Sequence, residues 1–153
     1  MTKAFTFLFI AALPFWLASC LDSECMEATE ASVKVFFYDC DTVPALAVTP
    51  DSLTLYGVGN AVKIYDNQKI TAPALLPLKE SGGETEFIIN INGTADTVRF
   101  VYSGSLRLVS KECGYAMSYA IDTVCFTANE IDSITITNHD VTVQNTENIA
   151  IFY

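Results

Sequence analysis

The stretch TEFIININGTADTVRFVYS, residues 85–103, decides the fold class of this chain. Its two halves are rich in Ile, Val, Phe and Thr and alternate apolar with polar side chains, as half-buried β-strands do. Between the halves lies Asn92-Gly93, a pair that favours the tight turns in which the backbone takes positive φ. The stretch therefore predicts a β-hairpin with strands over 85–91 and 96–103.

The same pattern continues on both sides of this hairpin. Runs at 52–58 and 61–66 flank a second turn signal, Gly59-Asn60. Residues 71–78 contain Pro73 and Pro77, which predict an edge or crossover segment. Further β-like runs occupy 31–38, 105–110, 115–121, 123–127, 133–137, 141–144 and 148–153. Short strands without a helical period predict an all-β, antiparallel β-sandwich, immunoglobulin-like or transthyretin-like, with a small β-barrel as the alternative.

The first 19 residues have the layout of a lipoprotein signal peptide. Lys3 precedes an apolar run, and Leu17-Ala18-Ser19-Cys20 resembles the lipobox of bacterial lipoproteins. The motif predicts cleavage before Cys20 and lipidation of that residue with acyl chains such as palmitate. An ordinary secreted protein and a single membrane-spanning helix are the alternatives, although the run is short for a span. We expect residues 20–31 to form a lipidated tether and residues 32–153 to form one β-sandwich domain.

Charge narrows the range of partners. Loss of Lys3 with the leader leaves seven basic and 18 acidic residues, a net charge of −11. A surface of this sign repels phosphate backbones, so we expect no nucleic-acid partner. It also repels anionic headgroups, so the expected membrane contact is the lipid on Cys20. The expected location is the outer membrane, on its periplasmic or cell-surface face.

Four cysteines remain once Cys20 is lipidated, and an even number outside the cytoplasm favours disulfides. We predict the pairs Cys25–Cys113 and Cys40–Cys125. The pairs Cys25–Cys40 and Cys113–Cys125 are the alternative, and free structural thiols are a third reading. We expect no metal site and no cofactor, because there is no C-x-x-C pair and only one histidine.

Several segments together resemble the small uncharacterised lipoproteins of Bacteroidota. The resemblance rests on the lipobox, VKVFFYD at 33–39, Glu112-Cys113-Gly114-Tyr115 and ENIAIFY at 147–153. It implies an all-β domain of unknown function that is anchored in the cell envelope. It implies no established catalytic residues.

A short triplet recurs along the chain, in which Asp is followed by Ser or Thr and then an aliphatic residue. One reading is turn chemistry, with Asp ending a turn and the next residues opening a strand. The triplet also resembles the O-glycosylation sequon of Bacteroidota. The candidate glycosylated residues are Thr42, Ser52, Thr97, Thr123 and Ser133.

Catalytic and ligand-binding patterns are weak in this sequence. His139 is the only histidine and lies in a turn-like context, so no base is positioned for nucleophilic catalysis. Asp39 and Asp41 resemble a calcium-binding pair but lack further ligands, so a solvated strand end is the better reading. Five tyrosines are either core residues or a sugar-stacking platform: Tyr56, Tyr65, Tyr102, Tyr115 and Tyr119.

These observations predict a non-catalytic, lipid-anchored cell-envelope protein with a structural or protein-interaction role. Its expected partners are the membrane, through lipidated Cys20, and an envelope protein or a glycan. The alternative is a surface binding module for a glycan, a small ligand or an ion.

Overall fold

The computed structural model describes residue 25 and residues 29–71, 73–144 and 146–153. The described residues form strands and connecting turns, with no helix among them. The strands are β1 (Ser32–Asp39), β2 (Leu46–Val48), β3 (Leu53–Gly57), β4 (Lys63–Gln68), β5 (Ala74–Pro77), β6 (Glu84–Ile91), β7 (Thr94–Ser110), β8 (Gly114–Phe126), β9 (Ser133–Ile136), β10 (Asp140–Val141) and β11 (Ile149–Phe152). None of the described residues belongs to a helix that is long and apolar enough to cross a membrane.

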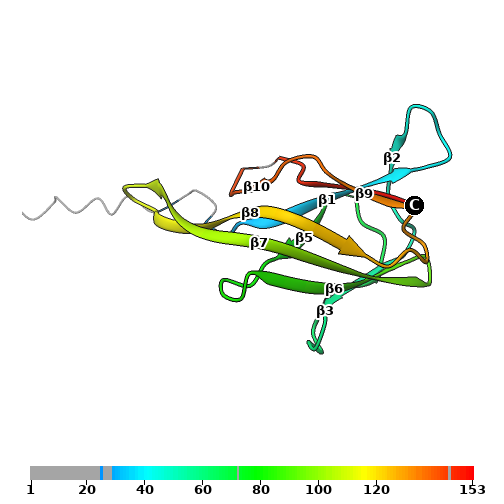
Figure 1. Cartoon of the computed structure of the whole chain (residues 1–153), viewed down its shortest axis with the longest axis horizontal. Helices are drawn as coiled ribbons and strands as arrows, with labels where there is room; N and C mark the ends of the chain where they lie inside the picture. The colour runs from blue at the N-terminus through cyan, green and yellow to red at the C-terminus, as the bar shows by residue number, and fades with distance from the viewer. Residues whose placement is uncertain (1–24, 26–28, 72, 145) are drawn as a thin grey trace, which may run out of the picture.

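Two sheets face each other across the core (Figure 1). The first has the order β2-β1-β11-β9, and β5 also pairs with β1. The second has the order β10-β8-β7-β6-β3-β4. The predicted all-β architecture of two packed sheets is therefore confirmed. One ladder departs from the antiparallel expectation, because β1 and β11 run parallel, with Val35 opposite Ile149.

The hairpin that opened the sequence analysis is present. β6 pairs with β7 from Ile91–Thr94 to Glu84–Val101, and Asn92 and Gly93 both have positive φ at the turn. Alternate side chains of β6 are buried, as the alternating pattern predicts. The proline-containing segment forms β5 at the edge of the first sheet, antiparallel to β1.

Two predicted strand breaks are absent. Residues 94–110 form one strand, β7, and residues 114–126 form its partner, β8. Gly104 lies inside β7, where a Cβ would approach the Met117 Cε at 3.0 Å. Asp122 is the extra residue of a β-bulge, since Val101 pairs with Thr123 while Tyr102 pairs with Ile121. Gly104 and the bulge at Asp122 thus lie within one long hairpin instead of ending its strands.

The core lies between the two sheets and is aliphatic and aromatic. Phe87 and Phe100 meet edge to face, with ring centroids 6.1 Å apart. Tyr153 packs against the core, and Phe152 stacks on Tyr38 with ring centroids 5.3 Å apart. The largest fully buried side chains are those of Phe87, Phe100, Leu53, Leu55, Leu76, Ile89, Ile91, Ile121, Ile131, Ile149, Ile151 and Val33.

Candidate functional site

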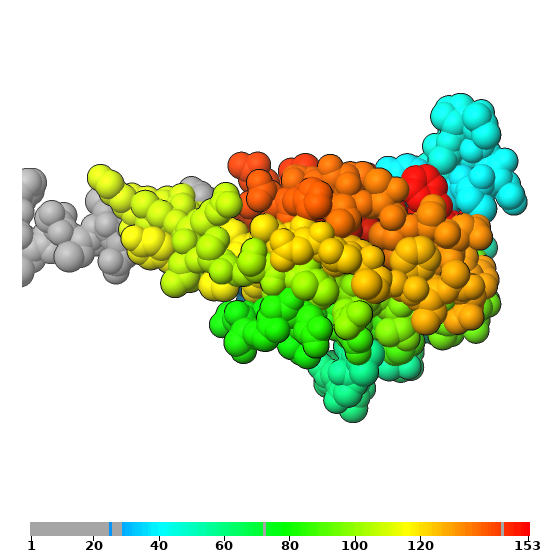
Figure 2. All heavy atoms as spheres, in the orientation of Figure 1, coloured from blue at the N-terminus to red at the C-terminus, as the bar shows by residue number. Residues whose placement is uncertain are grey.

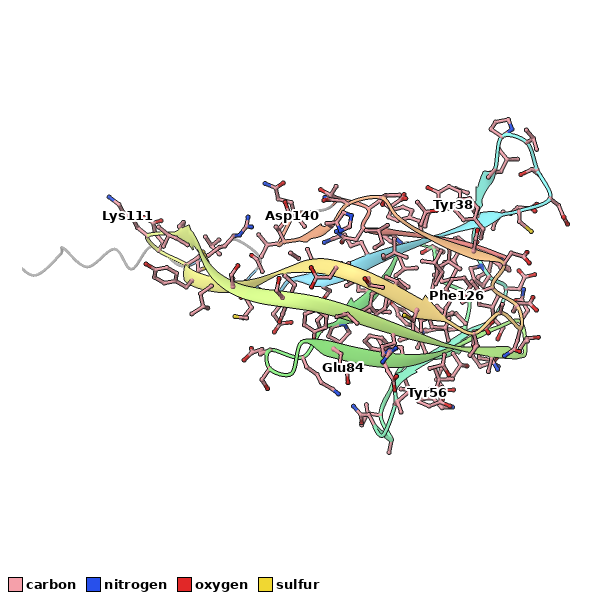
Figure 3. The ribbon with its side chains drawn as sticks, in the orientation of Figure 1. Tyr38, Tyr56, Glu84, Lys111, Phe126 and Asp140 are labelled. Carbon is pink, nitrogen blue, oxygen red and sulfur yellow. A yellow bond between two sulfur atoms is a disulfide. The ribbon has the colours of Figure 1, made fainter. Side chains whose placement is uncertain are left out.

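The β7–β8 hairpin extends past the end of the first sheet. That sheet ends on this side at the Ser32–Pro77 pair, whereas the hairpin continues from Gly104–Tyr119 to Ser110–Gly114. These six further residues span roughly 20 Å at about 3.3 Å each, and the segments around residues 29–32 and 142–144 flank part of them. Figure 3 shows its tip, marked by Lys111, at the opposite end of the molecule from Tyr38 and Phe126.

One face of this extension continues the core-facing side of the hairpin, and its large apolar side chains are exposed. Strand alternation places Leu106 and Leu108 on the same side of β7 as buried Phe100 and Tyr102. Opposite them on β8 lie Met117 and Tyr115, respectively. Leu106, Leu108 and Tyr115 are 67%, 58% and 68% exposed. We call these three residues the hairpin surface; Figure 2 shows the projecting arm that carries them.

The tip of the hairpin is joined covalently to the N-terminal segment. Cys113 forms a disulfide with Cys25, with their Cα atoms 4.8 Å apart. The Cys113 amide donates a hydrogen bond to the Ser110 hydroxyl at 3.0 Å, and Gly114 has a φ of +71° in the turn. The predicted Cys25–Cys113 pair is therefore confirmed.

A groove lies at the base of the extension, between the hairpin and the segments around residues 29–32 and 77–80. Its volume is about 590 Å³. The Tyr119 ring closes its inner end, edge to face with Tyr102 at 5.4 Å. Burial, with the nearby Glu80 carboxylate adding to it, raises the pKa of Tyr119. Glu30 and Glu80, both exposed, lie in the groove wall together with the apolar side chains of Leu106 and Tyr115.

The other end of the molecule presents a projecting loop between β1 and β2, residues 40–45, which we call the distal loop (Figures 1 and 2). Thr42 braces it, donating to the Asp39 carbonyl and accepting from the Leu46 amide. Val43 is 99% exposed at its tip, before a cis peptide bond to Pro44, and Leu46 is also exposed. No sequence signal marked Val43, because exposure of one aliphatic residue depends on how the loop leaves the sheet.

The predicted Cys40–Cys125 disulfide is wrong, and both residues are exposed free thiols. The bulge at Asp122 shifts the alternation of β8, so that Thr123 and Cys125 share its exposed face. Cys40 lies just after β1, in the opposite sheet, and its thiol donates to the Asp132 carboxylate at 2.9 Å. That hydrogen bond, reinforced by burial and by the charges of Asp132 and Asp41, raises the pKa of Cys40 to about 11.

Asp96, which the sequence marked only as part of a recurring triplet, has a structural role. It is buried and accepts hydrogen bonds from the Thr127 hydroxyl and from the amides of Asn129, Glu130 and Ile131, at 2.6–3.0 Å. Burial alone would raise the pKa of Asp96, but these four hydrogen bonds outweigh it and lower that pKa. Asp96 therefore anchors the turn before β9 as a carboxylate.

The five triplets occupy different environments. Thr123 and Ser133 are exposed, whereas Thr42, Ser52 and Thr97 are half-buried. Turn chemistry, in which Asp ends a turn and the next residues open a strand, accounts for two triplets. The triplet at 51–53 leads into β3, and the triplet at 132–134 leads into β9. It does not account for those at 96–98 and 122–124, which lie inside long strands. O-glycosylation at these residues stays a prediction, and Thr123 and Ser133 are the most accessible positions for it.

The five tyrosines do not form one platform. Tyr102 and Tyr119 are buried, and Tyr115 is exposed at the hairpin tip. Tyr56 and Tyr65 are half-buried on β3 and β4, and the Tyr65 hydroxyl accepts a hydrogen bond from the Leu75 amide at 3.0 Å. A stacking surface made of all five rings is therefore wrong, since β-strand alternation and sheet order separate them.

The remaining polar candidates also have local roles. His139 is an exposed turn residue, as predicted, and its Nδ1 contacts the Ile121 carbonyl oxygen. The Asp39 carboxylate accepts the Asp41 amide at 2.8 Å, which closes a turn at the end of β1. Within the described part of the chain, no three His, Cys, Asp or Glu side chains gather as metal ligands would. Cys20 lies outside the described residues.

Residues 52–153, more than half of the chain, match a family of unknown function, DUF6452. No curated protein and no solved structure matches the chain.

Proposed function

The chain belongs to the DUF6452 family, whose function is unknown, and we propose that it is a non-catalytic cell-envelope protein. In this proposal a lipid on Cys20 anchors it in the outer membrane. Its role is structural or protein-interacting, and the end remote from the anchor carries the interaction.

The observation that carries this proposal is the Cys25–Cys113 disulfide at one end of an elongated fold. Disulfides persist in oxidising compartments and are rare in the cytoplasm, so the bond supports export of the chain. Cys25 is five residues after Cys20, the cysteine of the lipobox-like sequence Leu17-Ala18-Ser19-Cys20. The anchor and the β7–β8 tip would therefore lie together, with the distal loop facing away from the membrane.

The distal loop supports an interaction role. A fully exposed Val43 and an exposed Leu46 sit on a loop that its own hydrogen bonds hold in shape. Apolar side chains displayed on a braced loop suit insertion into a partner's pocket, because little ordering entropy remains to be lost on binding. A structural role for the polar groups considered above, Asp96 and His139 among them, supports the non-catalytic reading.

A polar groove gives the binding-module alternative a specific basis. It has a volume of about 450 Å³ and lies beside β3, β4 and β6. Tyr56 contributes a ring, and Lys63, Asp66, Asn67 and Asn90 contribute hydrogen-bonding groups of the kind that recognise sugar hydroxyls. In a glycan-binding assay, Tyr56→Ala would abolish binding if this alternative held.

The test of the favoured function is site-specific photocrosslinking in the native cell. A photoreactive amino acid replaces Val43, and a matched protein carries it at Val62, which is 70% exposed elsewhere on the surface. We expect a discrete adduct with one envelope protein from position 43 and none from position 62. Equal adducts from both positions, or none from either, would argue against a distal interaction surface.

Mass spectrometry of the same material tests the anchor separately. The proposal requires an acylated N-terminal Cys20 peptide in protein purified from membranes. Hexose-type additions on the peptides that contain Thr123 or Ser133 would establish O-glycosylation. An unmodified Cys20 would remove the basis of the membrane anchor, whatever the crosslinking result.

A further inference from the structure

We propose that the hairpin surface is a membrane-contacting surface that docks on the phospholipid headgroups around the anchor and orients the domain. The inference rests on the proposed lipid on Cys20, and it goes beyond that proposal because it assigns a second, non-covalent membrane contact. The surface consists of Leu106, Leu108 and Tyr115 at the end of β7 and β8.

Chain length limits how far this surface can lie from the lipid. Cys25 is five positions after Cys20, and a fully extended chain of five residue steps spans at most about 18 Å. Cys25 is bonded to Cys113, in the turn between Ser110 and Gly114. A domain held at its tip in this way cannot move the hairpin surface far from the bilayer, whatever direction its far end takes.

The chemistry of the tip differs from that of the rest of the domain. Residues 103–117 carry two basic side chains, Arg107 and Lys111, against one carboxylate, Glu112. The chain without its leader carries a net charge of −11, so the hairpin end itself is less acidic than the rest, while the segment bonded to it through Cys25 carries Asp22, Glu24, Glu27 and Glu30. Basic side chains are attracted to anionic headgroups, and exposed leucine and tyrosine side chains partition into the interface.

The charged side chains around the hairpin surface limit how deeply this surface can enter the lipid. Arg107 lies between Leu106 and Leu108 and therefore points to the opposite face of β7, 3.9 Å from the Asp140 carboxylate. Glu30 and Glu80 are exposed in the wall of the groove that Leu106 and Tyr115 also line. These carboxylates would be repelled by anionic headgroups, so we expect the hairpin surface to reach the lipid while the two glutamates stay in water.

The test uses tryptophan as a depth reporter. The only tryptophan of the chain is Trp16, which leaves with the proposed signal peptide. Tyr115→Trp therefore gives a single reporter on the hairpin surface. Phe126→Trp gives a matched control on the same strand, β8, at its other end.

Each acylated full-length variant is reconstituted into phosphatidylethanolamine–phosphatidylglycerol vesicles that contain acyl-chain-brominated lipids. Interfacial side chains lie about 5–10 Å into the headgroup–acyl boundary, so bromine should remove about half or more of the Tyr115→Trp emission. The Phe126→Trp emission should stay unquenched. Adding Leu106→Asn and Leu108→Asn to the Tyr115→Trp protein should abolish the quenching, whereas adding Val62→Asn should leave it unchanged.

The outcomes separate this inference from the proposed function. An intact mass that shows acylated Cys20, together with equal, weak quenching of both reporters, would overturn membrane docking and leave the anchor intact. An unacylated Cys20 with an unquenched Tyr115→Trp reporter would overturn both. A blue shift of the reporter that depends on protein concentration and occurs without lipid would assign the surface to a second copy of the chain, against the proposal.

Discussion

At the scale of single residues, Asp96 shows how one buried carboxylate holds a turn in place. Its two oxygens accept four hydrogen bonds from the 127–131 segment. Asp96→Asn would turn an amide NH₂ toward backbone amides that are themselves donors. We expect a loss of about 2–4 kcal/mol in the free energy of unfolding, because those donors lose their acceptor. Urea denaturation measures it, with exposed Asp122→Asn as the control.

The same residue predicts a pH dependence. The folded-state pKa of Asp96 lies below its ordinary value of 3.8. A lowered folded-state pKa means that the unfolded chain takes up the proton first, so stability falls as the pH falls. The Asp96 contribution is therefore complete above pH 3.8 and is lost below it, through the lowered value. A difference between wild type and Asp96→Asn that persists unchanged to the lowest accessible pH would contradict this assignment.

Cys40 is predicted to be an unreactive thiol despite its exposure. Its hydrogen bond to Asp132 is the main cause of a pKa near 11, so little thiolate exists at pH 8. Asp132→Ala should lower the pKa of Cys40 and raise its thiolate fraction by up to roughly 100-fold. Because a thiolate of lower pKa is a weaker nucleophile, the alkylation rate should rise only about tenfold. Iodoacetamide labelling followed by peptide mass spectrometry gives the rate, with Cys125 as the internal reference. A change of equal size at Cys125 would refute the local explanation.

At the scale of elements, the two cysteine pairs should behave differently. Cys113→Ser removes a bond that closes 88 residues of sequence, and we expect a loss of about 2–4 kcal/mol in stability. Cys125→Ser removes only an exposed thiol and should change stability by less than about 0.5 kcal/mol. Thermal unfolding without reductant compares the two variants. Losses of similar size would indicate that Cys125 is bonded after all.

The elements also show what could be predicted from the sequence. Asn92-Gly93 and the two prolines of 71–78 act through local backbone conformation, so the hairpin and the edge strand could be recognised from them alone. The bulge at Asp122 could not, because a bulge depends on how β8 meets β7 across the sheet. The length of hairpin that stays exposed could not be predicted from the sequence either, since it depends on where the opposing sheet ends.

At the scale of the whole molecule, the two sheets share one core and should unfold together. Ile151 on β11 and Ile89 on β6 are both fully buried, one in each sheet. Each isoleucine-to-alanine change should lower stability by about 2–5 kcal/mol. Both variants should keep a single transition in which circular dichroism and tyrosine fluorescence coincide. Ile64→Ala, on the exposed side of β4, is the control. Two separate transitions would show that the sheets are independent units.

The parallel pairing of β1 with β11 also sets the order in which the chain can fold. The hairpins of the second sheet join neighbouring segments, so they can form as soon as those segments are available. The centre of the first sheet instead joins Val35 to Ile149, across most of the sequence. Closing so long a loop is slow. A chain synthesised from its N-terminus therefore leaves β1 without its central neighbour until β11 has been made. If the chain is exported unfolded, as the proposed function requires, this delay would keep it competent for translocation.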